Sequence, residues 1–331
     1  MIISRTPFRI SFFGGGTDYP VWYEENGGAV LSTTIDKYCY INCRYLPPFF
    51  EHKHRIVYSK IENVLDIKAI RHPAVREILE YMGIDQGVEI HHDGDLPARS
   101  GLGSSSSFSV GLLNALYALK SRMPSKYQLA KEAIHIERNL LGEHVGSQDQ
   151  VAAAYGGFNR ISFRRNGHFE VEPIILKENR MSDLQDHLML YFTGFSRFAS
   201  KIAKKQIELT PKKEHELIRM HAMVEEAKEI LISRRSISEL GALLDEAWQL
   251  KRSLTDKIST SDIDHIYQEA RSAGALGGKL LGAGGGGFML FLVKPGKQAS
   301  VRRRLNKLLE VKFKFDNSGS QIIFYKDAKL G

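Results

Sequence analysis

The chain has 331 residues, of which 43% are hydrophobic and 25% are charged, and its formal net charge at pH 7 is +8. This composition is that of a globular protein with a sizeable core, and the length favours two domains over one. Apolar runs such as "FMLFLV" are too short to cross a membrane, and the N-terminal stretch lacks the pattern of a signal peptide. The two cysteines, Cys39 and Cys43, are too few for a disulfide framework or a zinc site, so we expect reduced thiols in a cytoplasmic protein.

The positive charge is compatible with nucleic acid, a membrane surface or an anionic small ligand. Much of it is spread along expected helices, where it alternates with acidic residues. The chain has neither an arginine-rich tail nor an aromatic-basic motif of the RNA-binding type. We therefore expect no nucleic acid and no membrane partner. A solvated basic surface and a funnel for phosphorylated ligands both remain open.

Residues 1 to about 100 are expected to be mostly strands, because β-rich stretches such as "GGAVLSTTI" and "YCYINCRY" alternate with Gly and Pro. From Ser104 the apolar residues recur with the period of a helix, first in "SSSSFSVGLLNALYALKSR" and then in "SKYQLAKEAIHIERNLLG". Ser125 is the expected N-cap of the second helix. A third helix opens at "GSQDQVAAAYGG". Strands return around "FNRISFRR" and "FEVEPII".

After about residue 185 three amphipathic helices are expected, in "HELIRMHAMVEEAKEILISR", "SISELGALLDEAWQLKRSL" and "TSDIDHIYQEARSAGA". A glycine-rich turn, the strand "FMLFLVK", the helix "SVRRRLNKLLE" and the strands "VKFKF" and "SQIIFY" follow. The fold class is therefore α+β. We expect two domains, residues 1–180 and 181–331.

The loop "LPARSGLGSSSSF" joins an expected strand to an expected helix. Gly101 and Gly103 allow the backbone to approach a ligand, and the serines begin a helix whose first turn has free N–H groups and a positive dipole end. This combination binds phosphate. The loop has neither the lysine of a Walker A motif nor the glycine spacing of a dinucleotide fingerprint. A plain glycine turn with a serine cap is the alternative, but capping requires only one serine.

Glu137 lies in the middle of an apolar helical stripe that contains Ala130, Ala133, Ile134 and Leu141. A buried carboxylate is costly unless it is paired or holds a metal, and Mg²⁺ takes such hard oxygen ligands. A salt bridge, or a stripe rotated so that Glu137 meets water, explains the pattern equally well.

Asp149 is expected in the first turn of the helix that begins at "GSQDQ", where Ser147 and Gln150 have the spacing of a capping box. An acid at this position can simply complement the helix dipole. Alternatively, it is a general base held in place by the start of the helix.

Three motifs in order resemble the GHMP kinase family, which includes galactokinases, homoserine kinases and mevalonate kinases. They are "TPFRISFFGGGTDYP", the P-x-x-x-G-L-G-S-S motif from Pro97 to Ser105, and "KLLGAGGGGFML". The resemblance implies an N-terminal α+β domain, a C-terminal ferredoxin-like domain and an active site between them. It also implies transfer of a phosphoryl group from ATP to the hydroxyl of a small molecule.

The resemblance further assigns roles to individual residues. Arg9 and Asp149 would be catalytic, while Ser105 and Glu137 would hold Mg²⁺. The acceptor would be bound by Gly15, Gly16, Thr17, Asp18, Arg197, Gly284 and Gly285. The nucleotide would be bound by Pro97, Arg99, Ser100, Gly101, Leu102, Gly103, Ser104, Ser105 and Ser106.

Galactokinases and mevalonate kinases carry Gly-Glu-His where this chain has Gly14, Gly15 and Gly16, so the roles of the Glu and His side chains cannot be transferred. Asp18 remains, and in sugar kinases that aspartate holds sugar hydroxyls. The glycine-rich opening is most similar to the branch that contains D-glycero-D-manno-heptose 7-phosphate kinases, as is "YFTGFSRFAS". The resemblance implies a sugar phosphate and ATP as ligands, with Arg197 or the "HKHR" stretch as candidates for a second phosphate.

Other functions remain open. A kinase of a free sugar such as fucose would lack the site for a second phosphate. A sugar sensor without catalysis is disfavoured by the presence of Ser105, Glu137 and Asp149. A mevalonate-type kinase is disfavoured because Thr17 and Asp18 suit hydroxyls better than an apolar chain. The sequence does not indicate the oligomeric state.

Overall fold

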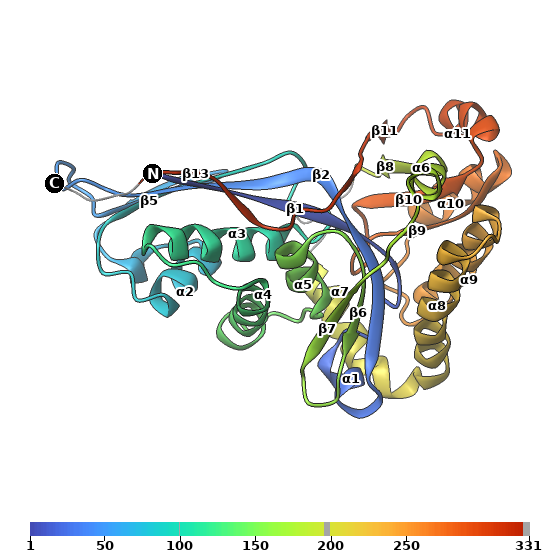
Figure 1. Ribbon diagram of the computed structural model, residues 1–331, viewed down its shortest axis with the longest axis horizontal. Coiled ribbons are helices and arrows are strands. Elements are labelled where there is room, and N and C mark those ends of the chain that lie inside the picture. The colour runs from blue at the N-terminus through green and yellow to red at the C-terminus, as the bar shows by residue number, and fades with distance from the viewer. Residues whose placement is uncertain (99, 195–198, 327–331) are drawn as a thin grey trace.

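The computed structural model describes residues 1–98, 100–194 and 199–326, and these form two sheets with helices packed against them (Figure 1). In the described residues the first sheet has nine strands in the order β13-β1-β2-β5-β3-β4, with β12 and β6 paired to β2, and β7 paired to β6. Its strands are β1 (Ile2–Phe13), β2 (Gly28–Tyr45), β3 (His54–Val57), β4 (Ile61–Val64), β5 (Val88–Gly94), β6 (Phe158–Phe163), β7 (Phe169–Pro173), β12 (Phe315–Asp316) and β13 (Gln321–Tyr325).

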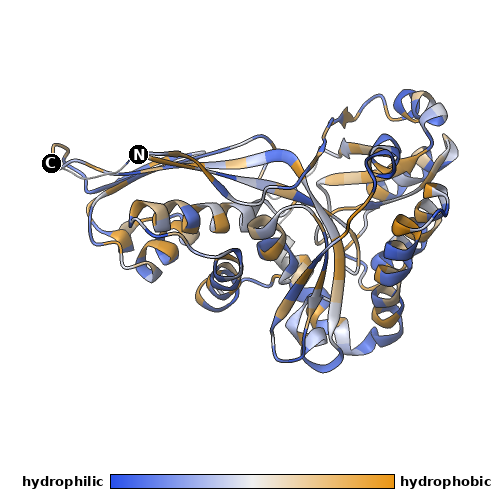
Figure 2. Cartoon of the chain, in the orientation of Figure 1, coloured by the Kyte–Doolittle hydropathy of each residue, from blue (hydrophilic) through white to orange (hydrophobic). Residues whose placement is uncertain are grey.

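The second sheet has four antiparallel strands in the order β11-β8-β10-β9. They are β8 (Leu188–Phe192), β9 (Ala275–Leu280), β10 (Phe288–Val293) and β11 (Leu309–Glu310). All six residues of β10 are apolar and buried, which is typical of a strand covered on both faces. Figure 2 shows hydrophobic residues along this sheet, whereas α8 and α9 beside it alternate between hydrophobic and hydrophilic residues.

The helices divide between the two sheets (Figure 1). They are α1 (Pro20–Asn26), α2 (Pro73–Tyr81), α3 (Ser104–Leu119), α4 (Lys126–His135), α5 (Gln148–Tyr155), α6 (Glu178–Asp186), α7 (Ala199–Leu209), α8 (Glu214–Ile232), α9 (Ile237–Ser253), α10 (Ser261–Ser272) and α11 (Gln298–Arg304). Short 3-10 turns span Ile67–Ala69, Thr210–Lys212 and Pro295–Lys297. None of the described helices combines the length and the apolar character that a bilayer crossing requires.

Local signals explain where several helices begin. The side chain of Ser125 accepts a hydrogen bond from the Gln128 N–H, so the expected N-cap of α4 is confirmed. A capping box formed by Ser236 and Glu239 begins α9, and such a box satisfies two otherwise free N–H groups. The α+β class is confirmed. Cys39 and Cys43 are both free and buried, as expected.

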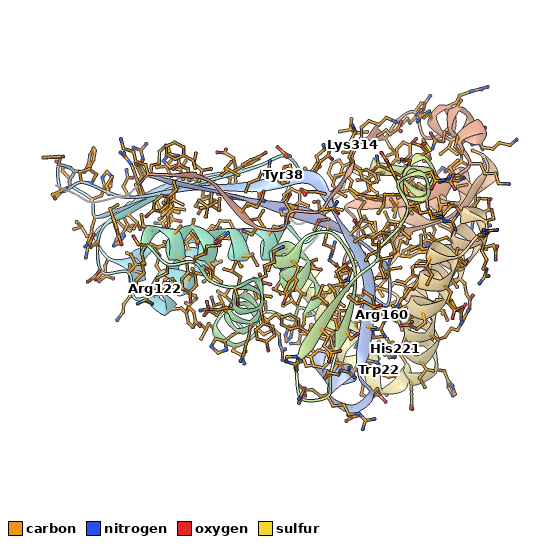
Figure 3. The ribbon with its side chains drawn as sticks, viewed as in Figure 1. Trp22, Tyr38, Arg122, Arg160, His221 and Lys314 are labelled. Carbon is orange, nitrogen blue, oxygen red and sulfur yellow. The ribbon has the colours of Figure 1, made fainter. Side chains whose placement is uncertain are left out.

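The chain returns to its first sheet after building the second. β12 pairs with β2, and β13 pairs with β1 in a register that sets Ile2 opposite Tyr325. Where the chain returns to the first sheet, the Tyr38 hydroxyl donates to Asp316 at 2.9 Å. Figure 3 labels Tyr38 and Lys314 in this region. The boundary near residue 180 stays a prediction, but residues 315–325 lie with the first sheet.

Candidate active site

A pocket of about 240 Å³ is lined by residues from both halves of the chain. The N-terminal half contributes β1, the glycine turn after it, the loop before α3 and the loop before α5. The C-terminal half contributes α7, α9 and the segment from β9 to the second glycine turn. Residues named from the sequence that line this pocket are Arg9, Gly15, Gly16, Asp18, Gly101, Gly103, Ser104, Ser105, Ser106 and Asp149.

The loop before α3 packs directly on the glycine turn after β9. Gly101 and Gly282 both have φ near +80°, a region that L side chains rarely adopt. A Cβ built on Gly101 would lie 2.3 Å from the Leu281 carbonyl oxygen, and one on Gly282 would lie 2.6 Å from the Gly101 Cα. The two glycines therefore allow the backbone of the loop before α3 to pack against the turn after β9.

Replacing Gly282 with alanine should both strain the backbone and push the two loops apart. A left-handed alanine costs about 1–2 kcal/mol, and the clash adds to that cost. We expect a lower melting temperature and at least tenfold weaker binding of a non-hydrolysable ATP analogue. Gly83→Ala is the matched control, because Gly83 has φ +58° and nothing within 4 Å of the added Cβ. Equal nucleotide affinity in both variants would contradict the assigned role of this contact.

Arg9 and Asp149 form a bidentate ion pair at the pocket wall. The Arg9 Nε donates to Asp149 Oδ1 at 2.8 Å, and Nη2 donates to Oδ2 at 2.8 Å. A third donor, Arg9 Nη1, bonds to the Gly101 carbonyl oxygen at 2.7 Å. Both residues line the pocket, and the Asp149 side chain is the more exposed of the two, at 25% against 4% for Arg9. Arg9 thereby fixes the carboxylate against the loop before α3.

Asp18 is buried in the turn that follows β1. Its Oδ1 accepts from the Gly16 N–H at 2.9 Å, and its Oδ2 accepts from Gln148 Nε2 at 2.9 Å. Burial raises the pKa of Asp18, while these two hydrogen bonds and the nearby Lys251 oppose the rise. Asp18 therefore presents a fixed acceptor to the pocket, suited to hydroxyl groups.

Glu137 is fully buried where α4 changes into a π-helical turn, Ile136–Leu140. Such turns occur often at functional sites. Oε2 accepts from Ser106 at 2.9 Å and from Gln150 at 2.5 Å, whereas Oε1 has no hydrogen-bond partner among the described residues. Burial raises the pKa of Glu137 to about 7. The Glu137 carboxylate and the neighbouring Ser106 hydroxyl are hard oxygen ligands of the kind that Mg²⁺ takes, but Glu137 does not line the pocket, and the described residues contain no cluster of three or more His, Cys, Asp and Glu side chains suited to a metal.

The expected capping box at the start of α5 is wrong. The Ser147 side chain makes no capping hydrogen bond, and its Oγ lies 3.4 Å from the Tyr23 hydroxyl. The Gln150 amide donates to Glu137 instead of reaching back to the helix start. A tertiary contact with a buried carboxylate has replaced the local one.

Seven described residues that were assigned to ligands or to the metal from the sequence do not line the pocket: Thr17, Pro97, Ser100, Leu102, Glu137, Gly284 and Gly285. Thr17 Oγ1 donates to the carbonyl oxygens of Gly14 and Ala29, so it closes the turn from within. The Leu102 side chain is in the core, and its carbonyl oxygen accepts from the Arg9 N–H. Ser100 is buried and Pro97 is exposed.

The second glycine turn meets the pocket through other residues than expected. Gly282 and Ala283 line it, whereas a Cβ on Gly284 would meet the backbone of Ile258, and the Gly285 N–H donates to the Ile258 carbonyl oxygen. Two more residues assigned from the sequence, Arg99 and Arg197, lie outside the described residues.

Sequence reasoning missed two lysines of the pocket, Lys251 on α9 and Lys279 on β9. Lys251 follows Ala247 and Trp248 by four and three residues, so it lies on the apolar face of its helix. This is the same signal that singled out Glu137. Lys279 is the first residue of "KLLGAGGGGFML", a motif whose glycines predicted only a turn.

Comparisons with known proteins agree with this geometry. Residues 67–157 match the GHMP kinases N terminal domain, and residues 223–311 match the GHMP kinases C terminal domain. The chain is 33% identical to the D-glycero-alpha-D-manno-heptose 7-phosphate kinase of Campylobacter jejuni, over 92% of this chain and 93% of that one. It is 28% identical to the galactokinase of Thermococcus kodakarensis, over 92% of each chain.

A solved structure is also similar. It is described as a D-glycero-D-manno-heptose 1-phosphate kinase from Bacteriodes thetaiotaomicron, with a TM-score of 0.81 and 25% identity over 99% of this chain and 100% of that one. The two domain matches, the order of the three motifs and the pocket between the two halves all agree. The chain belongs to the GHMP kinase family and is an ATP-dependent small-molecule kinase.

Proposed function

We propose that the protein transfers the γ-phosphoryl group of ATP to the anomeric hydroxyl of a sugar phosphate, D-glycero-D-manno-heptose 7-phosphate, and so makes the 1,7-bisphosphate. The observation that carries the proposal is the Arg9–Asp149 pair, held against the phosphate loop in a pocket that also contains Asp18. The 33% identity with a heptose 7-phosphate kinase supports the choice of sugar. We also propose that the enzyme acts in the cytoplasm.

In this proposal the ATP phosphates bind to the loop from Ser100 to Ser106 and to the first turn of α3, where backbone N–H groups and the helix dipole favour anions. Asp18 accepts hydrogen bonds from sugar hydroxyls. Asp149 accepts one from the attacking hydroxyl and aims its oxygen at the γ-phosphorus. The new P–O bond forms as the bond to ADP breaks, the hydroxyl proton passes to Asp149, and positioning supplies most of the rate.

Glu137, with a serine hydroxyl from the start of α3, is proposed to hold Mg²⁺. Ser105 faces the pocket, and Ser106 already donates to Glu137. The ion would neutralise charge on the ATP phosphates. Arg9 would stabilise the charge on the transferring group while it holds Asp149 in position.

The test is turnover of purified protein with ATP and Mg²⁺ against a panel of acceptors: heptose 7-phosphate, heptose 1-phosphate, mannose 6-phosphate, free heptose, fucose, galactose and mevalonate. We expect kcat/KM for heptose 7-phosphate to exceed that for free heptose at least a hundredfold, with the new phosphate at C1 by phosphorus NMR. Equal or better turnover of fucose would refute the sugar phosphate while leaving a kinase. Failure to turn over any acceptor would favour a sensor.

A further inference from the structure

Two lysines reach the pocket from the C-terminal half, and the chemistry proposed above does not use them. Lys251 is 5% exposed and Lys279 is 7% exposed. Lys251 Nζ donates to Gln206 Oε1 at 2.9 Å and approaches the Gly15 carbonyl oxygen at 3.4 Å. Lys279 Nζ donates to the Phe12 carbonyl oxygen at 3.0 Å. Both amines therefore converge on the end of β1 and the glycine turn after it.

These buried cations lack matching negative charge. Arg9 already has Asp149 as its partner, so Asp18 is the carboxylate that remains near the two lysines. Burial lowers the pKa of Lys251 to about 8 and that of Lys279 to about 7, and Asp18 opposes both shifts. A buried ammonium without a full partner is costly. An anion that binds in this pocket would therefore offset the cost of burying the two ammonium groups.

Further donors in this corner lack partners. Ser11 Oγ lines the pocket and has no hydrogen-bond partner among the described residues. Gln206 Nε2, on the side chain that accepts from Lys251, also has none there. Ser11 is 5% exposed and Gln206 is 2% exposed. A Cβ built on Gly16 would lie 2.9 Å from Gln206 Nε2. Two ammonium groups, an amide N–H and a hydroxyl thus surround the turn, and unpaired buried donors call for an acceptor.

The turn itself leaves room for that acceptor. A Cβ on Gly15 would meet only Gln148 Nε2 at 3.7 Å and Ser11 Oγ at 3.8 Å, both ordinary contact distances. Gly15 is also absent from the glycines with positive φ. Neither the backbone nor packing therefore requires glycine at this position. The space beside Gly15 is therefore free, and the Lys251 Nζ borders it at 3.4 Å from the Gly15 carbonyl oxygen.

We propose that Lys251 and Lys279, together with Gln206 and Ser11, bind the phosphate group that the acceptor sugar already carries. The inference rests on the proposed function and names the part of the pocket that selects a phosphorylated sugar. A phosphate has only acceptor oxygens at its periphery, so it satisfies the ammonium, amide and hydroxyl donors at once. Asp18 stays available for the sugar hydroxyls.

The first test compares Lys251→Met with Lys257→Met, a control on the surface whose side chain is 64% exposed. We expect Lys251→Met to raise KM for heptose 7-phosphate at least thirtyfold, with less than a twofold change in KM for ATP. The preference for phosphorylated over free heptose should fall at least tenfold, because only the phosphorylated sugar makes the lost contact. Lys257→Met should behave as wild type. An equal loss of kcat with both sugars would overturn the proposal and assign the lysines to the transferring phosphoryl group.

A binding readout separates this inference from the choice of sugar. With a non-hydrolysable ATP analogue saturating the nucleotide loop, inorganic phosphate should raise the melting temperature of the wild type but not of Lys251→Met or Gln206→Leu. Both variants remove a buried polar group, so the melting temperature of each variant without phosphate is measured to check that it is folded. If another sugar phosphate proves to be the substrate, the Lys251 dependence should persist. If Lys251→Met turns over heptose 7-phosphate with the wild-type KM, the inference fails although the proposed function stands.

Discussion

Asp149→Asn should slow phosphoryl transfer by about 10²–10⁴-fold while ATP still binds. Both carboxylate oxygens accept hydrogen bonds from Arg9. An asparagine offers one acceptor and turns an NH₂ group toward the second Arg9 donor, so the side chain must rotate away from the pose that orients the acceptor hydroxyl. Single-turnover kinetics measures the loss, and calorimetric titration with an ATP analogue measures nucleotide binding.

Asp85→Asn provides the control for this experiment, because Asp85 is exposed and the chemical change is identical. The melting temperature of Asp149→Asn should fall, since Arg9 is 4% exposed and loses the negative charge of its partner. If the single-turnover rate of Asp149→Asn stays near that of Asp85→Asn, then Asp149 only complements the dipole of α5.

Glu137→Gln should abolish most turnover without destabilising the fold. Oε2 of Glu137 accepts both observed hydrogen bonds, and Oε1 accepts none. A glutamine can place its carbonyl oxygen where Oε2 lies and its NH₂ group where Oε1 lies, so the contacts with Ser106 and Gln150 survive. The lost charge is the one proposed to hold Mg²⁺. We expect at least a hundredfold lower kcat and a higher Mg²⁺ concentration for half-maximal rate.

The melting temperature of Glu137→Gln should equal or exceed that of the wild type, because a buried charge is costly. The control is Glu80→Gln on an exposed position of α2. Direct binding of Mn²⁺ in the presence of an ATP analogue, followed by electron paramagnetic resonance, gives a second readout that does not require turnover. Unchanged metal binding in Glu137→Gln would remove Glu137 from the proposed metal site.

The sequence predicted those parts of the site that depend on local spacing. The apolar stripe around Glu137 left burial and exposure to water equally open, and the structure buries the side chain, whereas the glycine-serine loop predicted a helix that begins at Ser104. Lys251 carried an equal signal on α9, and applying the same test to every helix would have found it. Periodicity thus identifies a charged residue on an apolar face, whatever its later role.

Contacts between distant segments could not be predicted from spacing. The Ser147–Gln150 pair has the pattern of a capping box, but Gln150 donates to a carboxylate that belongs to another helix. Likewise, the packing of Gly101 on Gly282 joins segments about 180 residues apart. Local propensity allows several hydrogen-bond partners for a side chain such as Gln150, and the tertiary fold determines which of them it meets.

The return of β12 and β13 to the first sheet has a consequence for the order in which the protein can fold. β1 needs Gln321–Tyr325 as its outer neighbour, and β2 needs Phe315–Asp316. During synthesis the ribosome makes these partners some 300 residues after β1, so the edge of β1 stays unpaired while most of the chain emerges. Such long-range pairing slows folding. The sheet that carries Arg9 is therefore completed only after residues 315–325 have left the ribosome.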